Sequence, residues 1–269
     1  MSAPLTIWVQ GVGAWMPGLA DWPAWRGLLR GEREPDADAP ARPKPTRLSA
    51  GESRRVSTHV LAAIEVADQA VTMSAHAPDT LPCVFASQQG DAGIMDYMCA
   101  VLADAPQHLS PTRFHNSVHN APAGYWTIAC GCRAASNSVA AAGSSFGAAL
   151  LEAATLALTE EQPVLLVAND EPCGGPLGEV LTITQPFACA LVLSPQKDDR
   201  SMARLDLALV DSMTALDPPR HPHAQALIQA NPCAPALPLL EALAGIATTD
   251  VTLAATPTLG LAIHVSMLA

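Results

Sequence analysis

Hydrophobic positions along the chain fall into short continuous runs separated by amphipathic stretches. Residues 5–15, 81–87, 162–170 and 187–194 are nearly uninterrupted apolar runs, and such runs are typical of strands covered on both faces. Between the first two, residues 49–71 place apolar side chains at helical spacing. This alternation predicts an α/β fold with a mostly parallel sheet between layers of helices.

The remaining elements follow from the same periodicities. Further helices are expected over 92–105, 144–158 and 236–247, and further strands over 134–142, 201–211, 251–256 and 260–268. Residues 109–131 lead from a loop into another helix. Residues 31–48 are Pro-rich and charged and predict a surface loop, whereas residues 212–234 are expected to be irregular.

The composition predicts that another subunit covers part of the protein surface. Of 269 residues 49% are apolar and only 14% charged, a lean surface that favours contact with another subunit. No apolar run reaches about 18 residues, so no membrane span is predicted. The N-terminus reads as a strand and turn and not as a signal peptide. Seven cysteines without repeated spacing indicate a reducing cytoplasm, and we expect them all to be small buried side chains.

The net charge of −11 is unevenly distributed. Residues 26–55 hold eight of the fourteen basic side chains and five acids, which leaves about −14 on the remainder. An acidic body of this kind gives no reason to expect nucleic acid as a partner. An acidic carrier domain would likewise find little attraction outside the basic segment.

Two spacings resemble cofactor or metal motifs and fall short of them. Gly11 and Gly13 follow a strand, but Met16 stands where a dinucleotide fingerprint needs its third glycine. His115 and His119 are four residues apart, a spacing that puts both on one face of a helix. No third ligand and no H-E-x-x-H accompany them. We therefore expect hydrogen bonds to neighbouring loops, no metal and no cofactor.

A strand, a tight turn and a helix are predicted to meet at the sequence GSSFG, which fits the G-x-S-x-G nucleophile elbow. Ser145 would then be the nucleophile of a serine hydrolase, with Asp170 as the acid and His221, His223 or His264 as the base. No H-G-G motif precedes this turn, and short matches arise by chance in Gly- and Ser-rich sequence. The hydrolase is kept as an alternative.

A second group of polar residues follows a predicted strand. Gln88, Gln89 and Asp91 come directly after residues 81–87, at the end of a strand where open α/β sheets place functional groups. Polar residues are also common there without a function. By itself this group identifies no activity.

Five segments, taken in order, resemble the N-terminal half of a β-ketoacyl synthase of the thiolase superfamily. They are VQGVGAWMP, LSAGESRRVSTHVLAA, VFASQQGDAG, LSPTRFHNSVHNAPAGYWTIACG and SNSVAAAGSSFGAALLEA. The resemblance covers residues 5–195 and rests on order and spacing more than on one motif. It implies a thiolase-like layered fold, with a ketosynthase N-terminal-like domain in residues 1–200. Residues 201–269 would form an abridged C-terminal portion packed on the same core.

Active synthases of this family carry a cysteine at the junction of strand and helix, in a pattern close to V-x-T-A-C-x-S. The helix N-terminus there stabilises a thiolate, and backbone N–H groups hold the thioester oxyanion. Matching Val139, Ala142 and Ser145 to that pattern places Gly143 at the cysteine position. The two family histidines, one in an H-G-T-type motif and one after a glycine, have no counterpart. The resemblance thus implies no catalytic residues, with the nucleophile position lost at Gly143.

The resemblance also implies a partner. Thiolase-like subunits dimerise through the strand before the nucleophile, which pairs antiparallel with its counterpart. The corresponding interface residues are Ala134, Ala135, Ser136, Asn137, Ser138 and Val139. Loops near this junction line the partner's acyl tunnel, and the candidates to line or cap it are Met95, Met98, Arg113 and Phe114.

The sequence therefore favours a catalytically inactive, chain-length-factor-like subunit in the cytoplasm. It would pair with an active β-ketoacyl-ACP synthase as a heterodimer and shape its acyl or polyene tunnel. A short, catalytically empty chain of this kind resembles the partner subunit of aryl polyene ketosynthases. Acyl carrier protein would be met indirectly, through that partner. A third possibility is a truncated synthase-like protein whose binding role is unrelated to chain extension.

Overall fold

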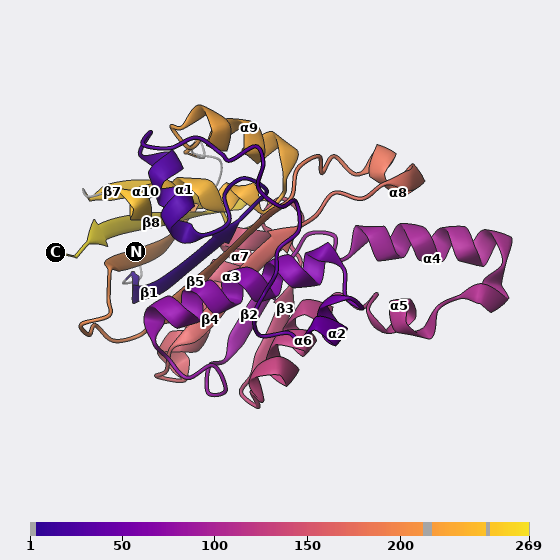
Figure 1. Cartoon of the computed structure of the whole chain (residues 1–269). Helices are drawn as coiled ribbons and strands as arrows, with labels where there is room; N and C mark the ends of the chain where they lie inside the picture. Colours follow the sequence, from indigo (N-terminus) through magenta and orange to yellow (C-terminus); the bar gives the residue numbers. More distant parts are fainter. Residues whose placement is uncertain (1–3, 212–216, 246–247, 269) are drawn as a thin grey trace.

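The computed structural model describes residues 4–211, 217–245 and 248–268. It contains one sheet with helices on both sides (Figure 1). In chain order the elements are β1 (Leu5–Trp15), α1 (Trp22–Leu29), α2 (Ala50–Ser53), α3 (Thr58–Ser74), β2 (Cys83–Ala86), α4 (Ala92–Asp104), η1 (Pro106–His108), α5 (Pro111–His115), α6 (Ala121–Cys130), β3 (Ser136–Val139), α7 (Ser145–Thr159), β4 (Val164–Asp170), α8 (Gly175–Val180), β5 (Phe187–Ser194), β6 (Ala203–Asp211), α9 (Pro222–Ala230), η2 (Ala234–Ala236), α10 (Leu237–Ala244), β7 (Thr249–Ala254) and β8 (Leu259–Met267).

The eight strands lie in the order β3-β2-β4-β5-β1-β6-β8-β7. Only the pairs β2–β3 and β2–β4 are parallel, and the other five pairs are antiparallel. The α/β prediction is confirmed, but the prediction of a mostly parallel sheet is wrong. Continuous apolar strands indicate cover on both faces, and here helices provide that cover for antiparallel strands as well.

Strand β5 shows how the sheet is buried. Phe187, Cys189 and Leu191 belong to the apolar cluster that contains the buried face of α7. The alternate residues Ala188 and Ala190 belong to the cluster that contains α3. Because successive side chains of a strand point to opposite faces, α3 and α7 cover opposite faces of the sheet (Figure 1). The layers are therefore helix, sheet and helix.

Two glycines in β1 allow α3 to approach the sheet. A Cβ atom at Gly11 would lie 2.0 Å from the carbonyl oxygen of Ala70, and one at Gly13 would lie 2.1 Å from that of Val66. Real side chains do not tolerate such distances, so any larger residue here would push the helix away. The G-x-G of β1 therefore serves helix–strand packing.

The C-terminal strands extend the same sheet. Strand β6 pairs with β1, and β8 and β7 continue the sheet outward. Leu237 and Leu240 of α10 join the cluster that also holds Phe146 of α7. The boundary expected near residue 200 stays a prediction.

Helices α1 and α8 were not predicted from the sequence, and three further elements differ from those expected. The helix predicted over 49–71 is two helices, because Ser57 caps a new start at α3 with its side chain. The strand predicted over 134–142 is shorter, as β3. The segment 212–234 contains the helix α9, since Pro222 occupies its first turn, where proline is tolerated. Residues 212–216 of that segment, and the end of the helix predicted over 236–247, lie outside the described residues.

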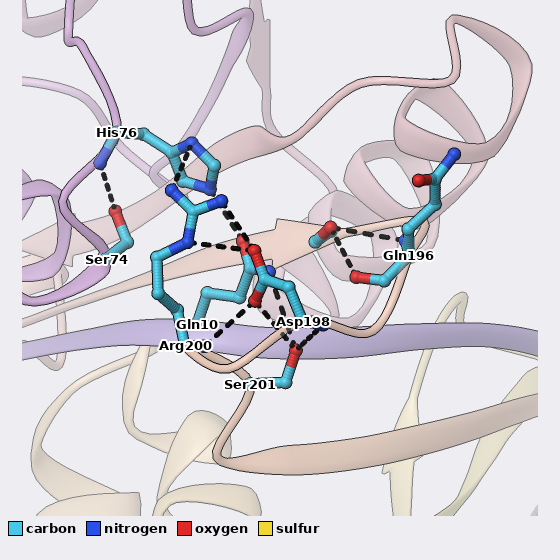
Figure 2. Close-up of polar contacts among 8 residues, drawn as sticks. Gln10, Ser74, His76, Gln196, Asp198, Arg200 and Ser201 are labelled. Carbon is cyan, nitrogen blue, oxygen red and sulfur yellow. Dashed lines mark hydrogen bonds and ion pairs between the residues drawn. The ribbon is translucent and has the colours of Figure 1, made fainter.

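A polar cluster fixes the loop between β5 and β6 (Figure 2). Gln10, at the register shift of β1, donates from Nε2 to Asp198 Oδ1 over 2.7 Å, and its Oε1 lies 2.6 Å from His76 Nε2. Arg200 and Ser201 both bond to Asp198. Burial lowers the pKa of His76, and Arg200 lowers it further. The neutral imidazole thus ties the end of α3 to this loop.

All seven cysteines are free thiols, but the expectation that all are buried is wrong. Cys83, Cys189 and Cys233 are buried, Cys99 is exposed, and Cys130, Cys132 and Cys173 are half-buried. Small side chains of this kind are accommodated at partly exposed helix and loop positions as well as in the core. Among the helices of the described residues, none combines the length and apolarity needed to cross a membrane.

Candidate functional site

The turn between β3 and α7 has the shape that the sequence predicts. Ala142 adopts a left-handed conformation with φ of 47°, which is uncommon for a residue with a side chain. The turn is closed by a bond of 3.0 Å from Ser144 N to Ala141 O. Gly143 is exposed, and a Cβ placed on it would meet no heavy atom within 4 Å in the part of the chain that the structure describes. The turn leaves space where a side chain would project.

That space belongs to a cavity of about 500 Å³. Gly143 follows β3, and Gln88 and Gln89 follow the parallel neighbour β2, so the cavity lies at the carboxyl ends of these strands. The rest of the wall comes from the segment after α8 and from the end of α9. Its residues are Val180, Leu181, Thr182, Ile183, Ile228, Gln229, Asn231, Pro232 and Pro235. No charged side chain lines this cavity among the described residues.

Asp170, at the end of β4, forms hydrogen bonds to the wall of the cavity that contains Gln88 and Gln89. Its carboxylate accepts from Ser87 Oγ at 2.6 Å, from Gln88 N at 2.9 Å and from Gln89 N at 3.3 Å. The Cys233 thiol donates to the same group at 3.1 Å. Asp170 is fully buried, so these donors replace the water it would otherwise bind. The carboxylate therefore positions the two glutamines that face the cavity.

Asn231 joins this network from the opposite wall. Its Nδ2 donates to Asp170 O at 2.7 Å and to Gln185 O at 2.9 Å. Sequence reasoning singled out Gln88 and Gln89 but missed Asn231 and Cys233, because their segment read as irregular. An asparagine and a cysteine next to prolines gave no signal that this loop closes the cavity.

Ser145 does not occupy the position of a catalytic serine. It is fully buried, and its Oγ donates to Ala142 O at 2.7 Å and accepts from Ala141 N at 3.0 Å. A hydroxyl held inside its own turn cannot reach a substrate. The final glycine of the motif has a packing role, since a Cβ on Gly147 would lie 2.0 Å from Ala254 O.

The expected partners of Ser145 lie elsewhere. Asp170 is engaged by Ser87, and His264 of β8 pairs with Asp250 at 2.7 Å. No hydrogen bond links Ser145 to a histidine in the described residues. The structure therefore does not assemble the triad of the hydrolase alternative.

The two spaced histidines are also separated. His115 ends α5, whereas His119 lies in the following loop, so they do not share a helix face as the spacing suggested. His119 Nε2 lies 2.9 Å from Ser87 O, a bond to a neighbouring loop as expected. Within the described ranges no group of three or more His, Cys, Asp or Glu side chains is arranged to hold a metal ion.

Three ionisable side chains lie near this network, of which His59 is buried and Asp91 and Glu171 are half-buried. Asp91 caps α4 by accepting from Ile94 N at 2.9 Å. Burial lowers the pKa of His59, whose Nδ1 lies 2.9 Å from Asn169 Nδ2. Burial raises the pKa of Glu171 to about 8, and Asp91 and Asp170 raise it further. The carboxyl of Glu171 therefore holds its proton at neutral pH.

The proton on Glu171 makes the stability of the fold depend on pH. Its pKa is about 8 in the folded chain against an ordinary 4.5, so ionisation increasingly opposes folding as pH rises from 4.5 to 8. Glu171→Gln removes this penalty. We expect its Tm to exceed that of the wild type by roughly 5 °C at pH 8.5 and to match it near pH 4.5. Calorimetry across this range tests the prediction, with Glu179→Gln on α8 as an exposed control. A gain that does not vary with pH would contradict it.

The residues expected to line a tunnel lie together on the arm, the name used here for α4, α5 and α8, which extend beyond the sheet (Figure 1). Met95 and Met98 lie on α4, and Phe114 on α5 is 58% exposed. The Arg113 guanidinium stacks 4.0 Å above the ring of Tyr97, which joins α5 to α4. The arm thus presents apolar side chains to solvent.

The expected interface strand is an edge of the sheet. Strand β3 pairs with β2 on one side and has no strand on the other among the described residues. Ser136, Asn137 and Ser138 are exposed. Cys83 N donates to Ala135 O and Ser87 N to Val139 O. Because alternate residues of a strand point their backbone groups to opposite sides, those of Ser136 and Ser138 face outward.

The helix–sheet–helix layers define a thiolase-like fold, with an exposed glycine, Gly143, in the turn between β3 and α7. Residues 22–238 match the family described as "Beta-ketoacyl synthase, N-terminal domain", and the chain belongs to this family. No curated protein matches the chain.

Solved structures show the same fold. One chain of the ketosynthase ApeO in complex with its chain length factor ApeC, from Xenorhabdus doucetiae, has a TM-score of 0.73 and 24% identity, covering 97% of this chain and 99% of that chain. The ishigamide ketosynthase/chain length factor has a TM-score of 0.72 and 12% identity, covering 98% of this chain and 100% of that chain. AntDE:AntF, a type II PKS acyl-carrier protein in complex with its ketosynthase, has a TM-score of 0.73 and 12% identity, also covering 98% of this chain and 100% of that chain. At these identities the similarity establishes the fold.

Proposed function

We propose that this chain is a catalytically inactive, chain-length-factor-like subunit. It pairs with an active β-ketoacyl-ACP synthase and shapes the acyl or polyene tunnel of that enzyme in aryl polyene biosynthesis. The observation that carries the proposal is Gly143, the residue that the resemblance matches to the nucleophile, because it offers an open turn and no side chain to acylate. The similarity to a chain of the ApeO–ApeC complex, nearly end to end in both chains, supports it.

The absence of a nucleophile follows from the chemistry around the cavity. Glycine has no side chain to acylate. Cys233 lies beneath the cavity wall, but burial raises the pKa of its thiol well above the ordinary value, and Asp170 raises it further. Cys233 also donates its proton to that carboxylate. A thiol in this setting stays protonated and is a poor nucleophile.

Partner binding is supported by two exposed features, the open edge of β3 and the arm. The open edge of β3 offers the outward backbone groups of Ser136 and Ser138 to an antiparallel strand. The arm adds apolar side chains that a monomer would leave in water, including Met95 at 40% and Val180 at 75% exposure. Such surfaces mark interaction sites.

A role in shaping a tunnel is assigned to Met95, Met98, Arg113 and Phe114. All four lie on α4 and α5 of the arm, which we assign to the surface that the partner contacts. Flexible methionine side chains suit a wall that contacts an elongated apolar chain. Starter unit and chain length would then depend on these residues together with those of the partner.

Carrier protein reaches the pair through the synthase subunit. The body outside residues 26–55 is strongly acidic, which opposes direct docking of an acidic carrier. The same charge argues against nucleic acid. Seven free thiols agree with a cytoplasmic location.

Co-expression with an active β-ketoacyl-ACP synthase from the same organism tests the proposal. Wild-type chain should co-purify as a heterodimer, and Ser138→Pro should lose the complex because proline removes an outward N–H and blocks strand addition. Ser138→Ala keeps that N–H and should bind normally. A soluble monomer that forms no complex would show that the proposed function is wrong, and would leave a role unrelated to chain extension.

The hydrolase alternative is examined on the same preparation. A fluorophosphonate probe should leave Ser145 unlabelled, because its hydroxyl is buried and bonded within the turn. Labelling of Ser145 would restore the hydrolase.

A further inference from the structure

Gly124 lies inside the helix α6, where glycine is costly. Replacing a helical alanine by glycine destabilises by roughly 1 kcal/mol, so an interior glycine usually has a packing reason. Gly11, Gly13 and Gly147 have such a reason, since a Cβ on each would lie about 2 Å from a backbone oxygen. A Cβ on Gly124 would meet no heavy atom within 4 Å in the described parts of the chain. Its own chain therefore does not require glycine here.

The open space at Gly124 is the floor of an apolar hollow of about 250 Å³. Ile128 lies one turn further along α6 and is 76% exposed, and Val118 on the opposite side is 52% exposed. Among the described residues, His115 and Tyr125 are the ionisable side chains that line the hollow, and the Tyr125 hydroxyl is already hydrogen-bonded within the wall. A charged or strongly polar occupant would find few partners.

The walls of the hollow are held rigidly. Tyr125 Oη donates to Asn116 Oδ1 at 2.9 Å, and Asn116 Nδ2 donates to Arg55 O at 3.3 Å. Asn116 is only 1% exposed, so this chain of bonds links α5, α6 and the segment between α2 and α3 below the surface. On its other face α6 packs Trp126 against α3. The hollow is therefore preformed, which lowers the entropic cost of filling it.

The position of the hollow indicates what fills it. Helix α6 leads through a short loop into β3 and contacts that strand. A protein seated on the open edge of β3 would therefore lie beside α6, the helix that carries Gly124 and the exposed Ile128. We propose that the hollow at Gly124 is a socket for one large apolar side chain, aromatic or branched, of the synthase subunit. This rests on the proposed function and adds a point of contact outside strand pairing.

The test fills the socket from within. Gly124→Leu places a side chain in the hollow and should weaken binding of the co-expressed synthase by about tenfold or more, as expected at an interface hot spot. The Tm of the variant should equal or exceed that of the wild type, because leucine favours the helix. Thr72→Leu adds the same side chain to an exposed position of α3, beside β1 and four strands from β3, and should bind normally. Ile128→Ser removes the rim without altering the floor and should also weaken binding.

The outcomes separate the socket from the pairing itself. Wild-type binding by both Gly124→Leu and Ile128→Ser would overturn the socket while leaving the heterodimer intact. If Gly124→Leu does not fold, Ile128→Ser alone decides. Failure of the wild-type chain to bind would instead refute the proposed function. A homodimer that Gly124→Leu dissociates would assign the socket to a second copy of this chain and overturn the proposal.

Discussion

Gly13→Ala is expected to destabilise the fold by about 3 kcal/mol or more, because its new methyl group would overlap the carbonyl oxygen of Val66. In a chain of this size such a loss lowers Tm by roughly 10 °C. The carbonyl belongs to the middle of α3, so relief requires moving the whole helix off the sheet. Thermal unfolding followed by circular dichroism measures the effect.

Gly51→Ala is the matched control, since its methyl group would come no closer than 3.8 Å to the Ser49 hydroxyl. It lies in the helix α2, where alanine is the better residue, so its Tm should be unchanged or slightly higher. If Gly13→Ala unfolds at the wild-type temperature, α3 does not pack on β1 as described.

Asp170→Ala is expected to destabilise the fold about as much as Gly13→Ala, because it removes a buried hydrogen-bond acceptor. The substitution leaves Ser87 Oγ, two backbone N–H groups and the Cys233 thiol without their buried acceptor. Each unsatisfied buried group costs about 1–3 kcal/mol, so a loss of roughly 4 kcal/mol is expected, read from the midpoint of urea unfolding. The walls of the cavity at Gly143 should loosen with it.

Asp250→Ala serves as the comparison for Asp170→Ala. Its carboxylate is 84% exposed and pairs with His264, and exposed pairs contribute about 0–1 kcal/mol. Near-equal midpoints for the two variants would show that the network around Asp170 carries no special stability.

The sequence predicted the elements better than their arrangement. The apolar runs located the buried strands β1, β2, β4 and β5 correctly because continuous hydrophobicity reports burial on both faces. Strand direction has no such signature in side-chain pattern, so the antiparallel majority of the sheet could not be read from it. Helix α9 was missed because proline discourages helices everywhere except in the first turn, where Pro222 stands.

The parts of the cavity at Gly143 that come from local sequence features could be predicted. The turn at Gly143 and the glutamines after β2 are local features, and both lie where the pattern placed them. Asn231 reaches the cavity from more than 80 residues beyond Gly143, and only the folded sheet brings it there. The direction of the Ser145 side chain was equally hidden, since a G-x-S-x-G motif does not say whether the hydroxyl points outward or back into its own turn.

The open edge of β3 has a consequence for the life of the protein in the cell. An unpaired strand edge is a template for indiscriminate association between copies, and this one carries neither lysine nor proline to discourage it. Under the proposed pairing, the synthase subunit acts on this chain as a chaperone does, by covering a surface that would otherwise recruit other copies. Under that pairing, the two chains would have to be produced in similar amounts, because an excess of this chain would be left with its strand edge uncovered.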